Sequence, residues 1–508
     1  MNTILKNASH LALSCALAGF LSACGSSSDS SEAPPPAAPT TAAYSAVLAG
    51  AQENPPVLTA SAGSAAFTLD TTSNLLTGTV TTTDLTGIAA HIHLAEPGLN
   101  GGVIIPLAES APGSGVWNVP AATTLTAAQV SALNAGGLYV NVHSQLNPGG
   151  QIRGQIGRLV QTARLTGSQE NPPTSSTASG SGVFSVDRIT RALTARVVTT
   201  GMTGTVAHMH TAAIGANGGV AVAFSETAAG SGIWVPSTPT VLTEAQYLSF
   251  IGGGMYMNVH SATNPGGEIR GQIGLDVYDV TMVGAQEVPP VVGGGTATAR
   301  VIVNPTTREL TGSINNVSVT ANNGHLHGGV YGASGGVVVP ATISAAGSPI
   351  WNFAPTNLSA AQYRALLHGN WYANSHSAAN PGGEARGQIG NVVRTGLMAG
   401  SNEVPANSST AGGRATAALD PNTLDIAVTM VTTGLSATAA HLHIGAVGAN
   451  GGVIVPLTEG PVGTWRSAAG AKLTQAQAVA FAAGGTYFNA HTPAFPGGEI
   501  RGQAAGLD

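Results

Sequence analysis

The sequence predicts an all-β protein made of four tandem Greek-key β-sandwich or barrel-like domains, each with one short helix. Three observations predict this class. After a Pro-rich start, the chain matches itself at a shift of 116 or 117 residues, so one unit occurs four times. The 69 glycines, with abundant Thr, Val and Ala, favour short strands and tight turns over long helices. Each copy also holds about eight alternating apolar segments between turn residues, which is typical of a Greek-key domain.

The chain divides into six segments, because export and tether signals precede the repeats. The predicted boundaries are 1–23 for a signal peptide, 24–41 for a tether, and 42–158, 159–275, 276–391 and 392–508 for repeats 1 to 4. A single domain of the combined length would be unusually large. Each repeat is long enough to form a core of its own, so we expect separate domains in series rather than a solenoid.

The first 23 residues have the features of an export signal. Lys6 supplies a positive start, and a short apolar stretch ends in small residues at Ala23. Such a stretch is too short to anchor stably across a bilayer and is typical of a cleaved signal peptide. The motif Leu-Ser-Ala-Cys that ends at Cys24 resembles the lipobox of bacterial lipoproteins. The resemblance implies that Cys24 carries acyl chains that attach the protein to a membrane; the alternative is ordinary cleavage, which leaves a free thiol.

The residues after Cys24 indicate where the protein is held and how. Gly25 stands where an Asp would favour retention at the inner membrane, so we expect the outer membrane or the cell surface. The segment 24–41 is rich in Ser and Pro and cannot bury a core. It is therefore predicted to be a tether between the membrane and the repeats.

Composition excludes several classes of function. Charged residues make up only 8% of the chain, the net charge is -6, and Lys472 is the single lysine after the signal. Binding to a nucleic-acid backbone needs clustered Lys and Arg, so nucleic acid is not an expected partner. The two cysteines, Cys15 and Cys24, precede the repeats, which therefore have neither disulfides nor a thiol nucleophile. Nucleotide-binding loops and His-Glu-x-x-His motifs are also absent from the sequence.

Each repeat carries the same motifs in the same order. A Gln-Glu pair, or Asn-Glu in repeat 4, is followed 38 residues after its Glu by a His-x-His. A Gly-rich turn, an apolar run, one Trp and a short helix signal come next. A hairpin block ends the repeat; in repeat 1 it reads Tyr-Val-Asn-Val-His, Asn-Pro-Gly-Gly and Gln-Ile-Arg-Gly-Gln.

The helix signal is a capping box, in which a hydroxyl residue precedes a Gln by three positions. The hydroxyl residues are Thr126, Thr243, Ser359 and Thr474. Glycines that would end the helices are Gly136, Gly253, Gly369 and Gly484.

Taken together, the His-x-His, the Asn-Gly-Gly turn and the closing Asn-Pro-Gly-Gly-Glu-Ile-Arg-Gly-Gln resemble the CHRD domain, the module named after chordin. The resemblance covers 42–508. It implies an extracellular β domain of poorly defined activity, which in chordin stands beside modules that bind growth factors. It implies no particular reaction.

Twelve of the fourteen histidines form one triplet in each repeat. The triplets are His91, His93 and His143; His208, His210 and His260; His325, His327 and His376; and His441, His443 and His491. On a strand, His91 and His93 project to one face, and Tyr139, Asn141 and His143 likewise share a face. If the two strands are neighbours, the three imidazoles converge, and three imidazoles with an open position suit copper or zinc.

Other repeated polar residues are candidate partners of this site. The glutamates are Glu53, Glu170, Glu287 and Glu403, which are candidate fourth ligands or outer partners that fix a histidine tautomer. The residue after each Pro-Gly-Gly is a weaker ligand candidate, because it is Gln in repeat 1 and Glu in the other repeats. The arginines are Arg153, Arg270, Arg386 and Arg501, which cannot be ligands and are expected to pair with a carboxylate.

Two functions of different class follow from these patterns. The first is a membrane-anchored, extracytoplasmic scaffold without a reaction, which binds protein, glycan or metal through repeated sites and gains avidity from their number. In it, the histidines hydrogen-bond backbone or Asn groups and pin two strands together. The alternative is a copper- or zinc-binding protein, for metal handling or metal-dependent redox chemistry, with one three-histidine site in each repeat. A His-x-His with a distant third histidine also resembles Cu,Zn superoxide dismutase, but the cysteine pair and zinc cluster of that family have no counterpart here.

Overall fold

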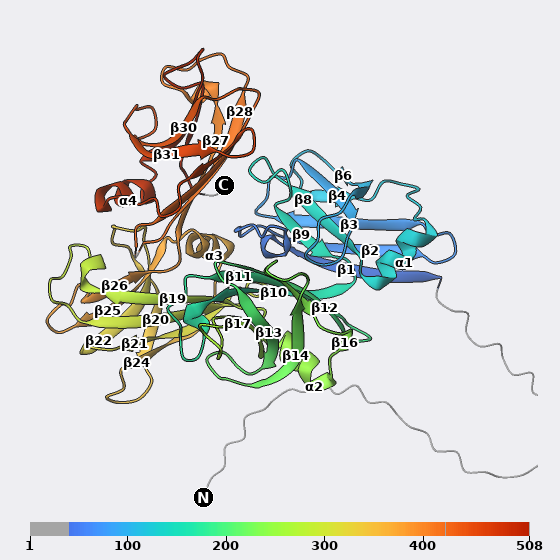
Figure 1. Ribbon diagram of the computed structural model, residues 1–508, viewed down its shortest axis with the longest axis horizontal. Coiled ribbons are helices and arrows are strands. Elements are labelled where there is room, and N and C mark those ends of the chain that lie inside the picture. The colour runs from blue at the N-terminus through green and yellow to red at the C-terminus, as the bar shows by residue number, and fades with distance from the viewer. Residues whose placement is uncertain (1–39, 422, 507–508) are drawn as a thin grey trace, which may run out of the picture. The chain divides into compact units, whose positions relative to one another are not determined.

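The structure is a computed structural model that describes residues 40–421 and 423–506. The described part is nearly all β, and each repeat forms a closed or nearly closed barrel with one short α-helix (Figure 1). The predicted fold class is therefore confirmed. The predicted signal peptide, the lipidation candidate Cys24 and almost all of the tether lie outside the described residues. Among the described residues, the helices are all too short to span a membrane.

The strands of repeats 1 and 2 follow the predicted apolar segments. Repeat 1 comprises β1 (Thr41–Ala49), the 3-10 turn η1 (Gly50–Gln52), β2 (Ala62–Asp70), β3 (Leu76–Thr83), β4 (Ala89–Leu94), β5 (Val103–Pro106), β6 (Ala108–Glu109), β7 (Val116–Asn118), α1 (Ala127–Ala135), β8 (Leu138–His143) and β9 (Ile152–Gln155). Repeat 2 comprises β10 (Arg158–Thr166), η2 (Gly167–Gln169), β11 (Ser179–Asp187), β12 (Ala192–Thr200), β13 (Gly204–Thr211), β14 (Gly219–Glu226), β15 (Ile233–Pro236), β16 (Thr240–Val241), α2 (Glu244–Ile251), β17 (Met255–Ser261) and β18 (Ile269–Gln272).

Repeats 3 and 4 have the same series of elements. Repeat 3 comprises β19 (Asp276–Val283), η3 (Gly284–Gln286), β20 (Thr296–Val303), β21 (Glu309–Asn316), β22 (Ala321–Gly328), β23 (Val337–Ile343), β24 (Ile350–Asn357), α3 (Ala360–Leu367), β25 (Trp371–Ser377) and β26 (Ala385–Gln388). Repeat 4 comprises β27 (Val392–Ala399), η4 (Gly400–Asn402), β28 (Gly412–Leu419), β29 (Ile426–Thr433), β30 (Ala439–Ile444), β31 (Val453–Glu459), β32 (Thr464–Ser467), α4 (Gln475–Ala482), β33 (Thr486–His491) and β34 (Ile500–Gln503).

The barrels have Greek-key topology. In repeat 3 the closed order is β19-β20-β21-β24-β23-β22-β25-β26, so two strands, β24 and β23, lie between β21 and β22, which are consecutive in the chain. Repeat 4 has the corresponding order, and repeat 2 closes through the pairing of β11 with β12. In repeat 1 the two ends of the sheet are β5 and β6, which only Leu107 separates in the chain. This barrel is therefore nearly closed.

Alternation along the strands fills the inside of each barrel. In β2, for example, Ala65, Phe67 and Leu69 are buried, whereas the residues between them are exposed. The repeated Trp and Ile side chains join the same apolar cores. Burial of this apolar surface stabilises each barrel, since the described repeats contain no cysteine.

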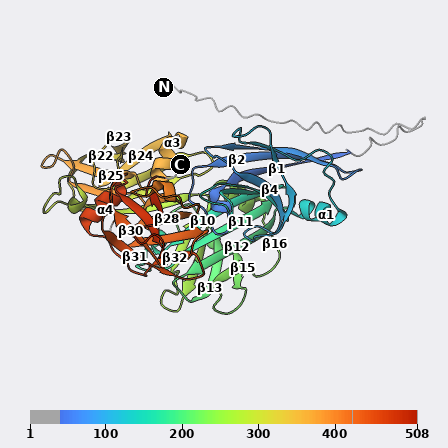
Figure 2. The same cartoon turned by 90° about the horizontal axis from the view of Figure 1, so that it is seen from above.

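The predicted helices are present, and both hydrogen bonds of the capping box form in each of them. The glycines expected at their ends all adopt positive φ, between 66° and 76°. Only glycine adopts this conformation without strain, which ends the helix and returns the chain to the sheet. In Figure 2, α1 stands outside the strands of repeat 1.

Candidate metal centre

The two histidine-bearing strands of each repeat are hydrogen-bonded neighbours. In repeat 1, β4 pairs with β8 so that Ala89 lies opposite His143, His91 opposite Asn141 and His93 opposite Tyr139. The alternate residues of both strands point into the core. The histidines therefore project together from the outer face of the barrel, and the other three repeats have the matching register.

This register brings the three imidazoles of every repeat to one point. In each triplet the three candidate ligand atoms lie within 4.8 Å of one another. In repeat 1 the ring centroids of His91 and His143 are 4.9 Å apart, those of His91 and His93 5.6 Å, and those of His93 and His143 6.3 Å. These separations allow one ion to contact all three rings, because metal–nitrogen bonds are about 2 Å long.

Backbone carbonyls fix the tautomers of two of the three rings. Nδ1 of His93 donates to the carbonyl oxygen of Gly101 at 2.9 Å, and Nδ1 of His143 donates to that of Pro148 at 2.9 Å. A carbonyl oxygen can only accept, so Nδ1 carries the proton and Nε2 keeps its lone pair in the neutral ring. The matching bonds in the other repeats are 2.9 to 3.1 Å long. These bonds leave the lone pair of both rings on Nε2.

The third ring approaches through its other nitrogen. Nδ1 of His91 lies 3.0 Å from Nε2 of His143, and the corresponding distance is 3.2 Å in repeats 2 and 3. Without a metal, a proton on Nδ1 of the first ring occupies the space between the two nitrogens. The candidate ligand atoms of each repeat are thus one Nδ1 and two Nε2 atoms.

Several of these nitrogens are buried without a hydrogen-bond partner. In every repeat, Nε2 of the second histidine of the triplet has no hydrogen-bond partner. These histidines are His93, His210, His327 and His443. In repeat 4 all three candidate ligand atoms are in this state, namely Nδ1 of His441 and Nε2 of His443 and His491. A buried polar atom without a partner costs about 1 to 3 kcal/mol. A bound metal ion would remove that cost.

Burial also keeps the rings neutral. It lowers the pKa of His91, His93 and His143 from the usual value, because the charged form is poorly solvated there. The same cause lowers the pKa of His325 and His443 to about 4. Metal ligation needs unprotonated imidazole, so the rings are already in the binding form near neutral pH.

The repeated glutamates do not join the ligand group. Each group of candidate ligands in the described residues contains the three histidines alone. Glu53 is instead buried beside the Asn141 side chain, and in the other repeats the matching Asn Nδ2 donates to the Glu at 3.3 to 3.5 Å. Burial raises the pKa of Glu53 to about 7. In this structure the Glu53 carboxyl lies beside Asn141 rather than within the histidine group, and the tautomers of His93 and His143 are fixed by backbone carbonyls.

The arginines also differ from expectation. Arg153 is 1% exposed, and it donates to the carbonyl oxygens of Leu99 and Glu96 and to Oε1 of Gln155. It forms no ion pair within the described residues, where the loop after β4 supplies neutral oxygens instead. Its guanidinium covers the Tyr139 ring, with Cζ 3.5 Å from the ring centroid.

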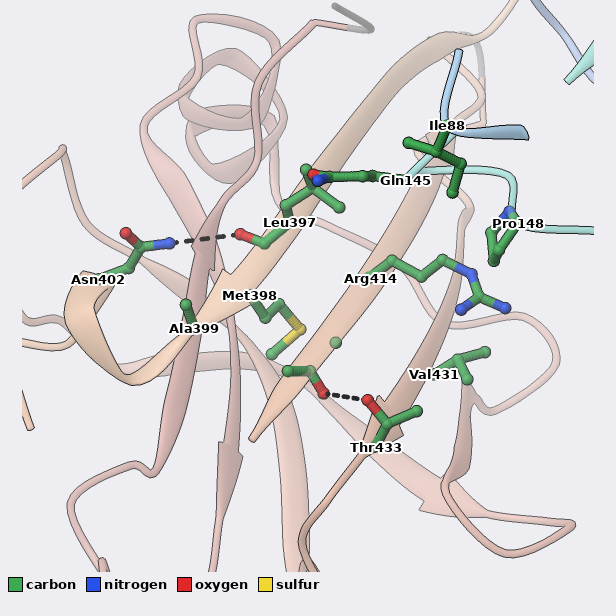
Figure 3. A pocket seen from close by; sticks show the side chains of 12 residues that line it. Ile88, Gln145, Pro148, Leu397, Met398, Ala399, Asn402, Arg414, Val431 and Thr433 are labelled. Carbon is green, nitrogen blue, oxygen red and sulfur yellow. Dashed lines mark hydrogen bonds between the residues drawn. The ribbon is translucent and has the colours of Figure 1, made fainter. Parts of the chain in front are cut away.

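The residues that follow each Pro-Gly-Gly bond to loop residues rather than to the histidines. Oε1 of Gln151 accepts hydrogen bonds from Ser144 and Asn147, and Glu268 Oε1 accepts one from Ser176 at 2.7 Å. The residue before each repeated Glu has a similar role. Gln52 Nε2 donates to the Val47 carbonyl at 2.8 Å. Figure 3 shows the matching bond of repeat 4, from Asn402 to the carbonyl of Leu397.

Sequence reasoning missed two features of the site. The Tyr139 ring stacks on the His93 ring, with centroids 4.8 Å apart and an interplanar angle of 9°. The carbonyls of Gly101 and Pro148 were not foreseen either. The sequence did contain a signal for these carbonyls. In every repeat a Gly-Gly turn follows the His-x-His, and a Pro-Gly-Gly follows the third histidine of the triplet.

The glycine beside the glutamate is required for packing. Gly150 has φ +139°, and a Cβ on it would lie 2.5 Å from both Glu53 Oε1 and Asn141 Nδ2. We expect Gly150→Ala to lower the free energy of unfolding of repeat 1 by about 2 to 4 kcal/mol, through backbone strain and overpacking. Urea unfolding of the mature chain measures this. Gly149→Ala is the control, because a Cβ there meets nothing within 4 Å; an equal loss in both variants would contradict the explanation.

Comparison with known proteins gives one family. The family model described as the CHRD domain matches residues 44–156, 161–273, 278–389 and 395–504. No curated protein matches the chain. These matches cover most of the described residues, and each of them contains one complete histidine triplet. No reaction is evident from the arrangement of the described side chains.

Proposed function

We propose that each repeat of this chain, which belongs to the CHRD domain family, binds one copper or zinc ion through its three histidines. The observation that carries the proposal is the set of three nitrogens within 4.8 Å, which recurs in all four repeats. Two of the three have their lone pairs directed by Nδ1 bonds to backbone carbonyls. Ligand histidines in metal sites are held by their second nitrogen in this way.

A purely structural role for the histidines explains less of the geometry. Strand pinning accounts for the Nδ1 bonds of the second and third rings to carbonyls, and for the contact between Nδ1 of the first ring and Nε2 of the third in repeats 1 to 3. It does not account for Nε2 of His93 and its counterparts, which are buried and have no partner among the described residues. A side chain that only pinned strands would gain stability from a partner at that atom.

The proposal includes the location of the protein. We expect export through the N-terminal signal, lipidation at Cys24, and attachment to the outer membrane or the cell surface through the Ser- and Pro-rich tether. Four repeats on one tether would then hold four metal sites at one place in the envelope. This arrangement combines the scaffold and metal-binding functions that the sequence suggests, with metal as the ligand of the scaffold.

Metal content tests the proposal directly. The mature chain, expressed with added copper and zinc and then dialysed, is expected to hold about four ions per molecule by elemental analysis. His143→Ala should reduce the content by one ion, because two nitrogens remain in repeat 1. His368→Gln is the matched control, since His368 lies outside the triplets, and it should leave four ions. A wild-type chain that retains no metal would refute the proposal.

A further inference from the structure

The wall of the site behind the second histidine is the same in every repeat. The Tyr139 ring stacks on the His93 ring, and the guanidinium of Arg153 lies against the Tyr139 ring. In the other repeats the stacked rings are 4.8 to 4.9 Å apart and the guanidinium carbon is 3.4 to 3.6 Å from the Tyr centroid. The residues are Arg270 and Tyr256, Arg386 and Tyr372, and Arg501 and Tyr487.

The charge on each of these guanidiniums is not neutralised by direct contact. All four are 1% or 2% exposed, so water screens them poorly. Their hydrogen bonds in the described part of the chain go to carbonyl and side-chain amide oxygens. None of them forms an ion pair with a described carboxylate.

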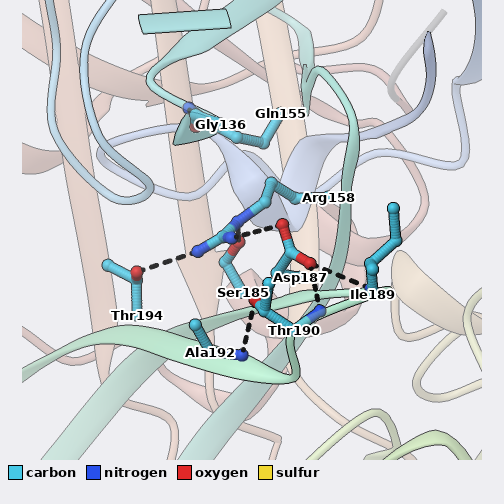
Figure 4. Close-up of polar contacts among 9 residues, drawn as sticks. All are labelled: Gly136, Gln155, Arg158, Ser185, Asp187, Ile189, Thr190, Ala192 and Thr194. Atoms are coloured by element: carbon cyan, nitrogen blue, oxygen red, sulfur yellow. Dashed lines mark hydrogen bonds and ion pairs between the residues drawn. The ribbon is translucent and has the colours of Figure 1, made fainter. Parts of the chain in front are cut away.

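Arg158, whose side chain is 7% exposed, shows the contrast. Arg158 donates to Asp187 at 3.3 Å, to Ser185 Oγ at 3.2 Å and to Thr194 Oγ1 at 3.0 Å (Figure 4). Its charge is balanced by the carboxylate. The guanidiniums behind the four histidine triplets have no such carboxylate partner among the described residues.

The ligands themselves bring no negative charge to the site. All three are neutral imidazoles, and no carboxylate of the described residues belongs to the group. The repeated carboxyl of Glu53 lies beside Asn141, and burial raises its pKa to about 7 against the opposing effect of the Arg153 charge, so about half of it is protonated at neutral pH and it offsets the charge of Arg153 only in part. A fixed positive charge repels a divalent ion about twice as strongly as a monovalent ion at the same place.

We propose that the three-histidine sites are copper sites that bind Cu(I) in preference to Cu(II) and Zn(II), with Arg153, Arg270, Arg386 and Arg501 as the residues that set this preference. The proposal rests on the proposed function and adds the identity and charge of the ion. Imidazole nitrogens suit copper, and the ligand set of one Nδ1 and two Nε2 atoms offers three donors. The arginines do not touch the ion. They act on it through their positive charge.

Competition titrations with the mature chain test the preference. Affinity for Cu(I) is measured without oxygen against a chromophoric Cu(I) chelator, and affinities for Cu(II) and Zn(II) against chelators of those ions. We expect Cu(I) to bind at least tenfold more tightly than either divalent ion. For a one-electron couple, each tenfold preference raises the copper potential by about 59 mV above that of the free ions, which voltammetry checks independently.

Matched variants separate charge from packing. A chain with Met at the four arginine positions should lose about tenfold or more of the ratio of Cu(I) to Cu(II) affinity, whereas Lys at the same positions should keep most of it. Arg158→Met is the control, because Asp187 already balances that charge, and it should leave the ratio unchanged. Circular dichroism establishes that each variant is folded. If the Met chain does not fold, the ratio of the wild-type chain still decides whether the sites prefer Cu(I).

The outcomes distinguish this inference from the proposed function. Four tightly bound divalent ions with no preference for Cu(I) would overturn the inference and leave the proposed function standing. A Met chain that is folded and keeps the wild-type ratio would overturn the role of the arginines. A wild-type chain that binds no metal in any of the three titrations would overturn both.

Discussion

Saturating copper or zinc is expected to raise the free energy of unfolding of each repeat by about 4 kcal/mol at a free metal concentration one thousandfold above Kd. The three nitrogens come together only when β4 pairs with β8, so the unfolded chain offers no comparable site. Binding to the folded form alone therefore shifts the unfolding equilibrium. The thermal midpoint of the mature chain, measured with and without metal, reports the shift.

The control for this prediction changes one histidine in every repeat. The chain with Gln in place of His93, His210, His327 and His443 should melt at the same temperature with and without metal. Magnesium should have no effect on the wild-type chain, because it prefers oxygen ligands. An equal rise for zinc in the wild-type and the variant chain would show that the stabilisation comes from elsewhere.

The fold was largely predictable because its signals are local and repeated. Alternation of apolar residues marks the strands, and the capping boxes at Thr126 and its counterparts mark the helices, which form with both cap bonds. Four copies of each signal reduce the chance that any one is accidental. Closure of the barrels was less certain from sequence, because it depends on long-range pairings such as β11 with β12.

From the sequence, the histidines could be predicted to converge only on the condition that their two strands are neighbours. Alternation shows that His91 and His93 share a face, but the pairing of their strand with that of His143 depends on a register between segments about 50 residues apart. The roles of Glu53 and Arg153 were harder still. Their partners are Asn141 and loop carbonyls, and such contacts depend on loop paths that no residue pattern specifies.

The structure also explains why the site needs its buried surroundings. Nδ1 of His93 donates to the carbonyl oxygen of Gly101, and the backbone N–H of Gly101 donates to the Tyr139 hydroxyl at 3.3 Å. The loop after β4 is thereby tied to the ring that stacks on His93. Loop, ring and ligand hold one another in place, so the nitrogen positions are set before any ion binds, which lowers the entropic cost of binding.

Acidification is expected to destabilise the metal-free protein between about pH 6.5 and pH 4. Burial holds the pKa of His443 near 4 in the folded state, whereas an unfolded histidine titrates near 6.5. Between these values the unfolded chain binds a proton that the folded chain does not, so the free energy of unfolding falls as pH falls, by up to about 1.4 kcal/mol per pH unit for this residue. His441 and His491, with pKa values also lowered by burial, act in the same direction.

The glutamate of the same repeat opposes this trend and gives the prediction a sharp test. Burial raises the pKa of Glu403, so the folded state keeps a proton that the unfolded state loses above about pH 4.5, and stability falls as pH rises through the raised pKa. Glu403→Gln removes that opposing contribution and should steepen the loss of stability in acid, whereas His443→Gln should flatten it. Urea unfolding of the metal-free chain at pH 7, 6 and 5 compares the three proteins. Equal slopes in all three would mean that these buried groups do not control the acid stability of the repeat.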